Sequence, residues 1–442
     1  MNIKLRLTAL SFFQFFVWGA WLTTLGTYGF GVKKWSGEEF GIVFMTLGIA
    51  SIVMPPIIGM IADRWVNAEK LYGILHILYG ITLIFLAKTD NPTTFFWILL
   101  VAMFFYMPTI SLSNSLSYTV LKNYQFDVVK TFPPIRVWGT VGFIAAMWLT
   151  NIFSDEYSPL AFGIEFGNKI ASFTGNILNA NQFYFASLFA ILLGIYSFTL
   201  PKCPPQNLIP QNASITEKLG LNAFKLFKNY KMALFFIFSM LLGAALQLTN
   251  MYADTYLKDF KNIAEYANSA VVQYSTMIVS ISQISETLFI LTIPFFLKKF
   301  GIKKVMLMSM LAWVLRFGLF GTGNPGSGVW MFVLSMIVYG VAFDFFNISG
   351  SLFVDNSTEP ALRSSAQGLF MMMTNGIGAI LGSFTSGWAI DQFFTKSFTS
   401  TTDLAGFLQT EVTNPKMMEF IGAQGKKVAA DGLLDSALLM KD

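Results

Sequence analysis

The chain has 442 residues, of which 54% are hydrophobic and only 12% charged, and its mean hydropathy is +0.58. Soluble domains usually carry about a quarter charged residues, so this composition indicates a membrane protein and excludes an ordinary soluble enzyme. The net charge is +5, and the lone Cys203 and His76 exclude a disulfide framework and a histidine-rich metal site. We expect no metal, no cofactor and no binding of nucleic acid.

Apolar runs long enough to cross a bilayer, about 20 residues each, follow one another along the chain. Six are expected first, near residues 8–30, 39–61, 71–88, 94–120, 132–153 and 182–200. Five more are expected near residues 231–256, 271–298, 302–321, 328–351 and 364–391. The predicted fold class is therefore an all-α polytopic membrane protein, with an N-terminal six-helix bundle over 1–200 and a C-terminal bundle over 231–391.

Residues 201–230, PKCPPQNLIPQNASITEKLGLNAFKLFKNY, are polar and rich in proline, and they include a basic amphipathic piece. We expect a cytoplasmic linker here, either a plain connector or one that joins two halves rocking about a midplane site. Residues 392–442 contain no further apolar run of span length. They are expected to form a polar extracytoplasmic segment before a twelfth span that is missing from this chain, although an eleven-span protein is the alternative.

Basic residues indicate the orientation, because Lys and Arg collect in cytoplasmic loops. They occur at every second loop, at Lys4, Arg6, Arg64, Lys70, Lys122, Lys130, Lys218, Lys225, Lys228, Lys231, Lys298, Lys299, Lys303 and Lys304. The alternate loops, such as 154–169, are neutral or acidic. The N-terminus is therefore expected in the cytoplasm.

Two carboxylates lie inside predicted spans, Glu286 in SISQISETLFI and Asp344 in VAFDFFNISG. A charged aspartate at a helix centre costs about 2.5–3.5 kcal/mol on insertion scales, and such residues usually face a bundle interior or a wet cavity. Either acid avoids this cost by taking up a proton, by pairing with a cation or by binding a ligand. A permanently hydrogen-bonded structural acid is the alternative.

Carboxamides accompany these acids at helical spacing. Gln283 and Glu286, Gln247 and Asn250, and Asp344 and Asn347 are each three residues apart and share a helix face. Amides donate and accept hydrogen bonds while carboxylates accept them, so the set suits a neutral ligand with hydroxyl groups and an amide-like edge. A single pair would also serve as a contact between helices.

The N-terminal half supplies a cation in FPPIRVWGTVGF, where Arg136, Thr140 and Phe143 fall at i, i+4 and i+7 on one helix stripe. Arg136 either faces the acids across a cavity or extends to the cytoplasmic surface. Gln14, Trp18 and Trp21 have the same spacing in the first span, and either line the cavity or pack between helices.

The segment GMIADRW at 59–65 resembles the gating signature of the major facilitator superfamily, with Gly59, Asp63 and Arg64 at the signature positions. Its counterpart in the second half, LKKFGIKK at 297–304, lacks the acid. Five longer segments resemble the bacterial nucleoside:proton symporters, or nucleoside permeases, and this resemblance runs from residue 1 to about residue 391. These segments are SFFQFFVWGAWLTTLG, FPPIRVWGTVGF, FFIFSMLLGAALQLTN, SISQISETLFILTIPFFL and SMIVYGVAFDFFNISGS.

The resemblance implies two pseudo-symmetric six-helix bundles around a central cavity. It implies a monomeric multi-pass carrier of the bacterial inner membrane that imports nucleosides such as uridine or adenosine together with protons, by alternating access. The implied substrate-binding residues are Arg136, Thr140, Phe143, Gln247, Asn250, Gln283, Glu286, Phe343 and Asp344. Glu286 and Asp344 are the candidates for proton coupling, and Ala245 stands where the family has an acid.

A proton-coupled sugar or oligosaccharide symporter of the same superfamily is the alternative function, because such carriers share the RVWGTVGF pattern and also recognise hydroxyl groups. The surplus of carboxamides and phenylalanines near the candidate site favours a nucleoside, since a base needs them more than a second sugar does. An intramembrane enzyme would need a histidine cluster, a Ser/Lys dyad or paired aspartates. We therefore predict a transporter and no enzymatic activity.

Overall fold

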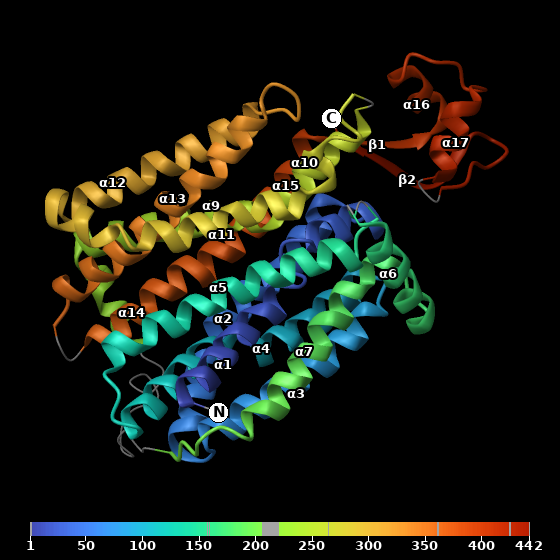
Figure 1. The fold of residues 1–442 in the computed structure, drawn as a ribbon. Helices are drawn as coiled ribbons and strands as arrows, with labels where there is room; N and C mark the ends of the chain where they lie inside the picture. The colour runs from blue at the N-terminus through green and yellow to red at the C-terminus, as the bar shows by residue number, and fades with distance from the viewer. Residues whose placement is uncertain are drawn as a thin grey trace.

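The computed structural model describes residues 2–156, 158, 160–205, 221–263, 265–359, 362–423 and 426–441. The elements of the first half are α1 (Ile3–Gly19), η1 (Thr27–Val32), α2 (Gly37–Arg64), α3 (Ala68–Ala87), α4 (Pro92–Asn123), α5 (Val128–Phe153), α6 (Ala161–Thr174), η2 (Leu178–Ala180) and α7 (Asn181–Ser197). In Figure 1 these helices, coloured blue to green, lie together.

The second half lies beside them in yellow to orange (Figure 1). Its elements are η3 (Leu221–Lys228), α9 (Tyr230–Asp259), η4 (Phe260–Asn262), α10 (Ala270–Gln273), α11 (Ser275–Ile290), α12 (Ile293–Thr322), α13 (Val329–Ser357), α14 (Arg363–Met371), η6 (Met372–Gly378) and α15 (Ala379–Phe393). Most of the predicted linker, residues 206–220, lies outside the described residues, and its end forms η3.

Nine helices within the described ranges are long and apolar enough to cross a membrane. Two of the eleven predicted spans are interrupted instead. The first, 8–30, is divided because α1 ends at Gly19 and the π-helical turn η1 begins only at Thr27. Leu22 lies in the hydrogen-bonded turns of this break and Leu25 in the short helical segment before η1, and both are buried.

The eighth predicted span, 271–298, is divided into α10, α11 and the start of α12. Tyr274 separates α10 from α11 with a non-helical ψ of 25°. Helix α12 continues into the ninth predicted span across Gly301, whose φ of 74° is open to glycine at little cost. The first and eighth predicted spans are therefore interrupted and do not form single continuous helices.

Local sequence explains where the other helices begin. Ser36 caps α2, since its side chain accepts from the Glu39 amide while the Glu39 carboxylate accepts from the Ser36 amide. Asn91 caps α4 with its side chain alone, which accepts from the Thr93 and Thr94 amides, and Pro92 follows in the first turn, where its missing N–H costs nothing.

Helices α2 and α15 join the two halves at very close range. A Cβ placed on Gly387 would lie 2.2 Å from the carbonyl oxygen of Gly37 and 3.1 Å from the Cα of Gly41. The Asp391 carboxylate of α15 accepts from the backbone N–H groups of Gly37 (2.7 Å) and Glu38 (2.6 Å) in the first turn of α2. An acid from one half thus caps and neutralises the positive helix end of the other.

The close approach of α2 and α15 predicts that Gly387→Val separates them. Overfilling a tight contact usually costs about 1–3 kcal/mol, so the melting temperature of the purified protein in detergent should fall. Gly318→Val in α12 is the matched control, because nothing lies within 4 Å of a Cβ at Gly318. Equal melting temperatures for the two variants would contradict the argument.

Residues beyond α15 form a small module, drawn in red in Figure 1 beyond the end of α15. The strands β1 (Thr395–Ser400) and β2 (Leu433–Lys441) pair antiparallel, and the short helices α16 (Thr401–Phe407) and α17 (Pro415–Ala423) lie between them in sequence. Its core is built by Phe398, Leu404, Ala405, Met417, Ile421, Leu434 and Leu438. The sequence predicted a polar segment here and gave no sign of these strands.

Candidate functional site

The nine predicted binding residues lie on four helices, α5, α9, α11 and α13. Helix α11 packs against the other three, so it forms the link between the α5 residues of the first half and the C-terminal set.

Asp344 lies at the middle of α13 and is 4% exposed. No hydrogen-bond donor among the described residues reaches its Oδ2 atom. A buried carboxylate oxygen of this kind carries the full cost of desolvation. Asp344 therefore has the property expected of a group that binds a proton or a ligand, and the permanently hydrogen-bonded structural acid is not what the structure shows.

Glu286 on α11 interacts electrostatically with charged residues of both halves. Its charge interacts with that of Arg136 on α5 and with that of Asp344 on α13. Within the described ranges, no ion pair of 4.0 Å or less joins Arg136 to either acid. Glu286 is thus the acid that interacts with Arg136, and Asp344 interacts with Glu286.

Arg136 lies within the bundle, because its guanidinium is 3.9 Å from the ring centroid of Phe15, a buried residue of α1. A cation over an aromatic face is stabilised by the ring quadrupole. Gly139 leaves room for this arrangement, since a Cβ there would lie 2.8 Å from an Arg136 nitrogen. This placement favours the sequence interpretation in which Arg136 faces the interior.

The three predicted amides are arranged in two ways. The Asn250 amide donates to Gln247 Oε1 at 3.1 Å, so these two side chains of α9 form one unit. Gln283 on α11 has a buried Oε1 atom to which no described residue donates. Gln283 and Asp344 thus each present an acceptor that the surrounding protein leaves unpaired.

Aromatic rings accompany both halves of the set. Phe343 stacks on Tyr339 with ring centroids 5.7 Å apart and planes 4° apart. On α5, Phe143 contacts Trp18 edge to face at 6.2 Å and packs on a cluster that includes Val279 of α11. Thr140, half-buried, lies one turn from Phe143.

The weaker candidates of the first span behave differently. Gln14 is fully buried inside the N-terminal half, where it donates to Thr109 at 3.0 Å and accepts from Tyr72 at 2.5 Å. Trp21 donates to Tyr79 at 2.7 Å. The packing interpretation is therefore correct for both residues, whereas Trp18 Nε1 has no acceptor among the described residues.

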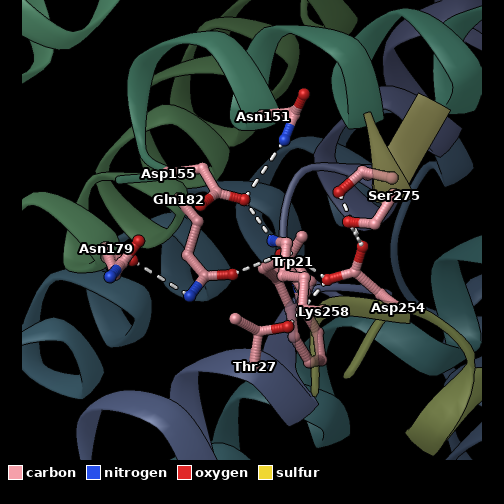
Figure 2. A network of polar contacts seen from close by, with 11 residues as sticks. Trp21, Thr27, Asn151, Asp155, Asn179, Gln182, Asp254, Lys258 and Ser275 are labelled. Atoms are coloured by element: carbon pink, nitrogen blue, oxygen red, sulfur yellow. Dashed lines mark hydrogen bonds and ion pairs between the residues drawn. The ribbon is translucent and has the colours of Figure 1, made fainter. Parts of the chain in front are cut away.

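Sequence reasoning missed a buried charge cluster where the two halves meet, here named the Lys258 cluster (Asp155, Asp254 and Lys258). The Lys258 ammonium pairs with Asp155, which follows α5, and with Asp254 one turn earlier on α9, at 3.2 Å. The three side chains are at most 7% exposed. Figure 2 shows the ammonium between the two carboxylates.

Hydrogen bonds complete the Lys258 cluster. Asp254 accepts from Ser275 and Thr276 at 2.8 Å each, and from Thr27 of η1 in the first half at 2.7 Å (Figure 2). Asn151 donates to Asp155 at 3.1 Å. A cavity of about 10 Å³, lined in part by Lys258 and Asp155, adjoins the cluster and has room for about one water molecule.

The i, i+4 pair of Asp254 and Lys258 was visible in the sequence as a signal of helix pairing. Asp155 was not, because it lies in a segment that the charge pattern assigned to a loop. The gating signature lies elsewhere on α2, with Arg64 as the last residue of the helix and with Asp63 half-buried. Gly37, at the other end of α2, contacts α15.

Comparison with known proteins identifies the family of the chain. The chain matches the family described as Nucleoside H+ symporter over residues 1–411. The nucleoside permease NupG of Escherichia coli (strain K12) is 48% identical over 394 residues, which cover 89% of this chain and 89% of NupG. The xanthosine permease of the same organism gives the same identity and the same coverage.

Solved structures of transporters are similar to this chain as well. A crystal structure of NupG, 49% identical, has a TM-score of 0.77 and covers 89% of this chain and 92% of that one. A bacterial homologue of the lysosomal transporter Spinster, 15% identical, has a TM-score of 0.63, covers 92% of this chain and 84% of that one, and supports the fold alone. The relatives are permeases and not enzymes, as predicted. From its match over residues 1–411 and its 48% identity to NupG, the chain belongs to the nucleoside:proton symporter family and has the major facilitator fold.

Proposed function

We propose that the protein is a proton-coupled importer of nucleosides that works by alternating access. The observation that carries this proposal is the buried group of Arg136, Glu286 and Asp344, in which Glu286 interacts with both of the other residues and no described residue donates to Asp344 Oδ2. Family membership supplies the substrate class, since relatives at 48% identity are named as permeases for nucleosides and for xanthosine.

The unpaired acceptors suit a nucleoside. Ribose hydroxyl groups would donate to Asp344 and Glu286, while Gln247, Asn250 and Gln283 read the edge of the base. Phe143 or Phe343 would stack on the base, and stacking tolerates any base because every base has a π-face. Arg136 and Thr140 complete the nine proposed binding positions.

The proton has a role in the charge balance of this group. Two carboxylates and one guanidinium carry one net negative charge, which is costly to move through the low-dielectric interior. A proton on Glu286 or Asp344 removes that charge. The loaded, neutral carrier can then change conformation, whereas the unprotonated one is held back.

The Lys258 cluster and the α2–α15 contact suit a carrier that is closed at one end. The basic loops place the opposite end in the cytoplasm, together with the N-terminus and the gating signature, in a bacterial inner membrane. The Lys258 cluster would then close the extracytoplasmic side and would have to separate each time a substrate enters. We propose that one chain is the working unit, because both halves of the site come from a single chain.

Uptake into proteoliposomes tests the proposal. With an inward proton gradient, labelled uridine or adenosine should accumulate above its external concentration, because one pH unit stores about 1.4 kcal/mol per proton, which is tenfold in concentration. Unlabelled nucleosides should compete and sugars should not. Accumulation of a labelled sugar without that of a nucleoside would establish the sugar symporter instead, and a lack of gradient dependence would exclude symport.

A further inference from the structure

Helix α6, between the fifth and sixth predicted spans, presents three different faces. The sequence predicted only a loop in this region, and the chain forms a helix of 14 residues. At 1.5 Å per residue the helix is about 21 Å long, too short to cross a bilayer. In Figure 1 it lies at the outer edge of the first half, across the end of α5.

The first face holds small residues and is covered by the protein. Gly163, Gly167 and Ala171 recur every four residues and are buried. A Cβ on Gly167 would lie 2.2 Å from the Phe153 carbonyl oxygen of α5. The Asn181 amide of α7 donates to the Gly167 carbonyl at 2.8 Å and to that of Phe153 at 3.1 Å. These contacts fix α6 on the ends of α5 and α7.

The second face is a phenylalanine stripe, formed by Phe162, Phe166 and Phe173. These side chains are 63%, 52% and 91% exposed. At 100° per residue they fall within about 40° of one another and about 120° from the small-residue face. Exposed apolar groups gathered on one side mark a surface that meets another apolar phase.

That stripe continues into the surface of the spans. Phe166 contacts Phe153 at the end of α5 with ring centroids 5.6 Å apart, and Phe153 contacts Phe185 of α7 at 5.8 Å. Both α5 and α7 belong to candidate membrane spans. The phenylalanine stripe is thus joined by aromatic contacts to two helices that are candidate membrane spans.

The third face is polar and holds Glu165, Asn168 and Ser172, all exposed. We propose that α6 is a lipid-docking helix, with its phenylalanine stripe buried at the headgroup boundary and its polar face in water. Interfacial helices divide apolar and polar residues in this way. The helix begins six residues after Asp155, so it fixes the depth in the membrane of the chain that carries the Lys258 cluster.

Site-directed spin labelling of the full chain in lipid vesicles tests this inference. Phe173→Cys and Ser172→Cys, each in a Cys203→Ser background, place a nitroxide on neighbouring residues that lie about 100° apart, one on the phenylalanine stripe and one on the polar face. We expect collision with molecular oxygen to exceed collision with a water-soluble nickel chelate several-fold at position 173, and the reverse at position 172. The pair Phe166→Cys and Asn168→Cys repeats the comparison nearer the middle of the helix.

Each other outcome overturns the proposal. Free access of the nickel chelate to position 173 would show that the stripe lies in water. Exclusion of both reagents, with an immobile label, would show that protein covers it, either a second copy of the chain or a different partner. The spin-label measurement does not use transport as its readout. Its result therefore stands whether or not the same variants transport nucleosides.

Discussion

Replacing Asp344 with asparagine is expected to abolish proton-driven nucleoside accumulation in proteoliposomes. The substitution keeps the shape of the side chain but removes the charge, the proton site and one of the two acceptor oxygens, in a carboxylate whose Oδ2 receives no hydrogen bond from a described residue. Internal uridine should then not rise above the external concentration, whereas the unsubstituted protein reaches about tenfold for one pH unit and one proton. Labelled uridine uptake with and without the gradient measures the effect.

Uridine exchange without a gradient separates the two roles of Asp344. If exchange persists while accumulation is lost, the residue carries the proton, and if both are lost, it also binds the nucleoside. Asp355→Asn is the matched control on the same helix, since Asp355 is half-exposed and lies 3.7 Å from Arg363 in an exposed ion pair of small energetic value. Accumulation by Asp344→Asn equal to that of this control would remove Asp344 from the site.

Features that depend on the local sequence were predicted correctly, and features that depend on contacts between distant residues were not. Membrane spans depend on local hydropathy, so nine predicted spans correspond to helices of span length. The breaks after Gly19 and at Tyr274 were not predicted, because each lies inside a stretch whose average hydropathy fits one span. Hydropathy reports what lipid tolerates and does not report whether the backbone stays helical.

The same distinction separates the site residues that were predicted from those that were not. Glu286 and Asp344 were identified because a charge in an apolar run is conspicuous and costly. Tyr339 was not, because an aromatic residue in such a run also fits simple packing, and only its parallel stacking on Phe343 places it at the site. Asp155 depends on Lys258, which is 103 residues away in sequence. No local pattern reports a contact of that separation.

Replacing Lys258 with methionine is expected to open the end of the molecule that the Lys258 cluster closes, and to stop transport. Methionine keeps an unbranched apolar chain in place of the lysine stem but has no ammonium group. The two carboxylates, at most 7% exposed, are then left without their cation. Removing one partner of a buried pair usually costs about 3–5 kcal/mol, because the remaining charge is buried and uncompensated. Separation of α5 from α9 relieves this cost, since the carboxylates then reach water.

A cysteine at Ser154 reports that separation. Ser154 is 3% exposed, lines the cavity beside the cluster, and its hydroxyl has no partner among the described residues, so Ser154→Cys removes no hydrogen bond that the structure shows. Labelling by a membrane-impermeant maleimide should be slow in the parent chain. The native Cys203 adds little background, because burial raises the pKa of its thiol to about 11 and the thiolate is the reactive form.

Lys258→Met should raise the labelling of Ser154→Cys at least about tenfold, which corresponds to 1.4 kcal/mol, a fraction of the cost of the unpaired charges. Lys303→Met removes the same charge from an exposed side chain of α12, outside the cluster, and should leave labelling slow. Adding Asp155→Asn and Asp254→Asn to Lys258→Met removes the repulsion and should slow labelling again. Because the triple variant also lacks Lys258, fast labelling in it would mean that the ion pairs themselves hold the halves together. Unchanged labelling in Lys258→Met would mean that the α2–α15 contact closes this end without the charges.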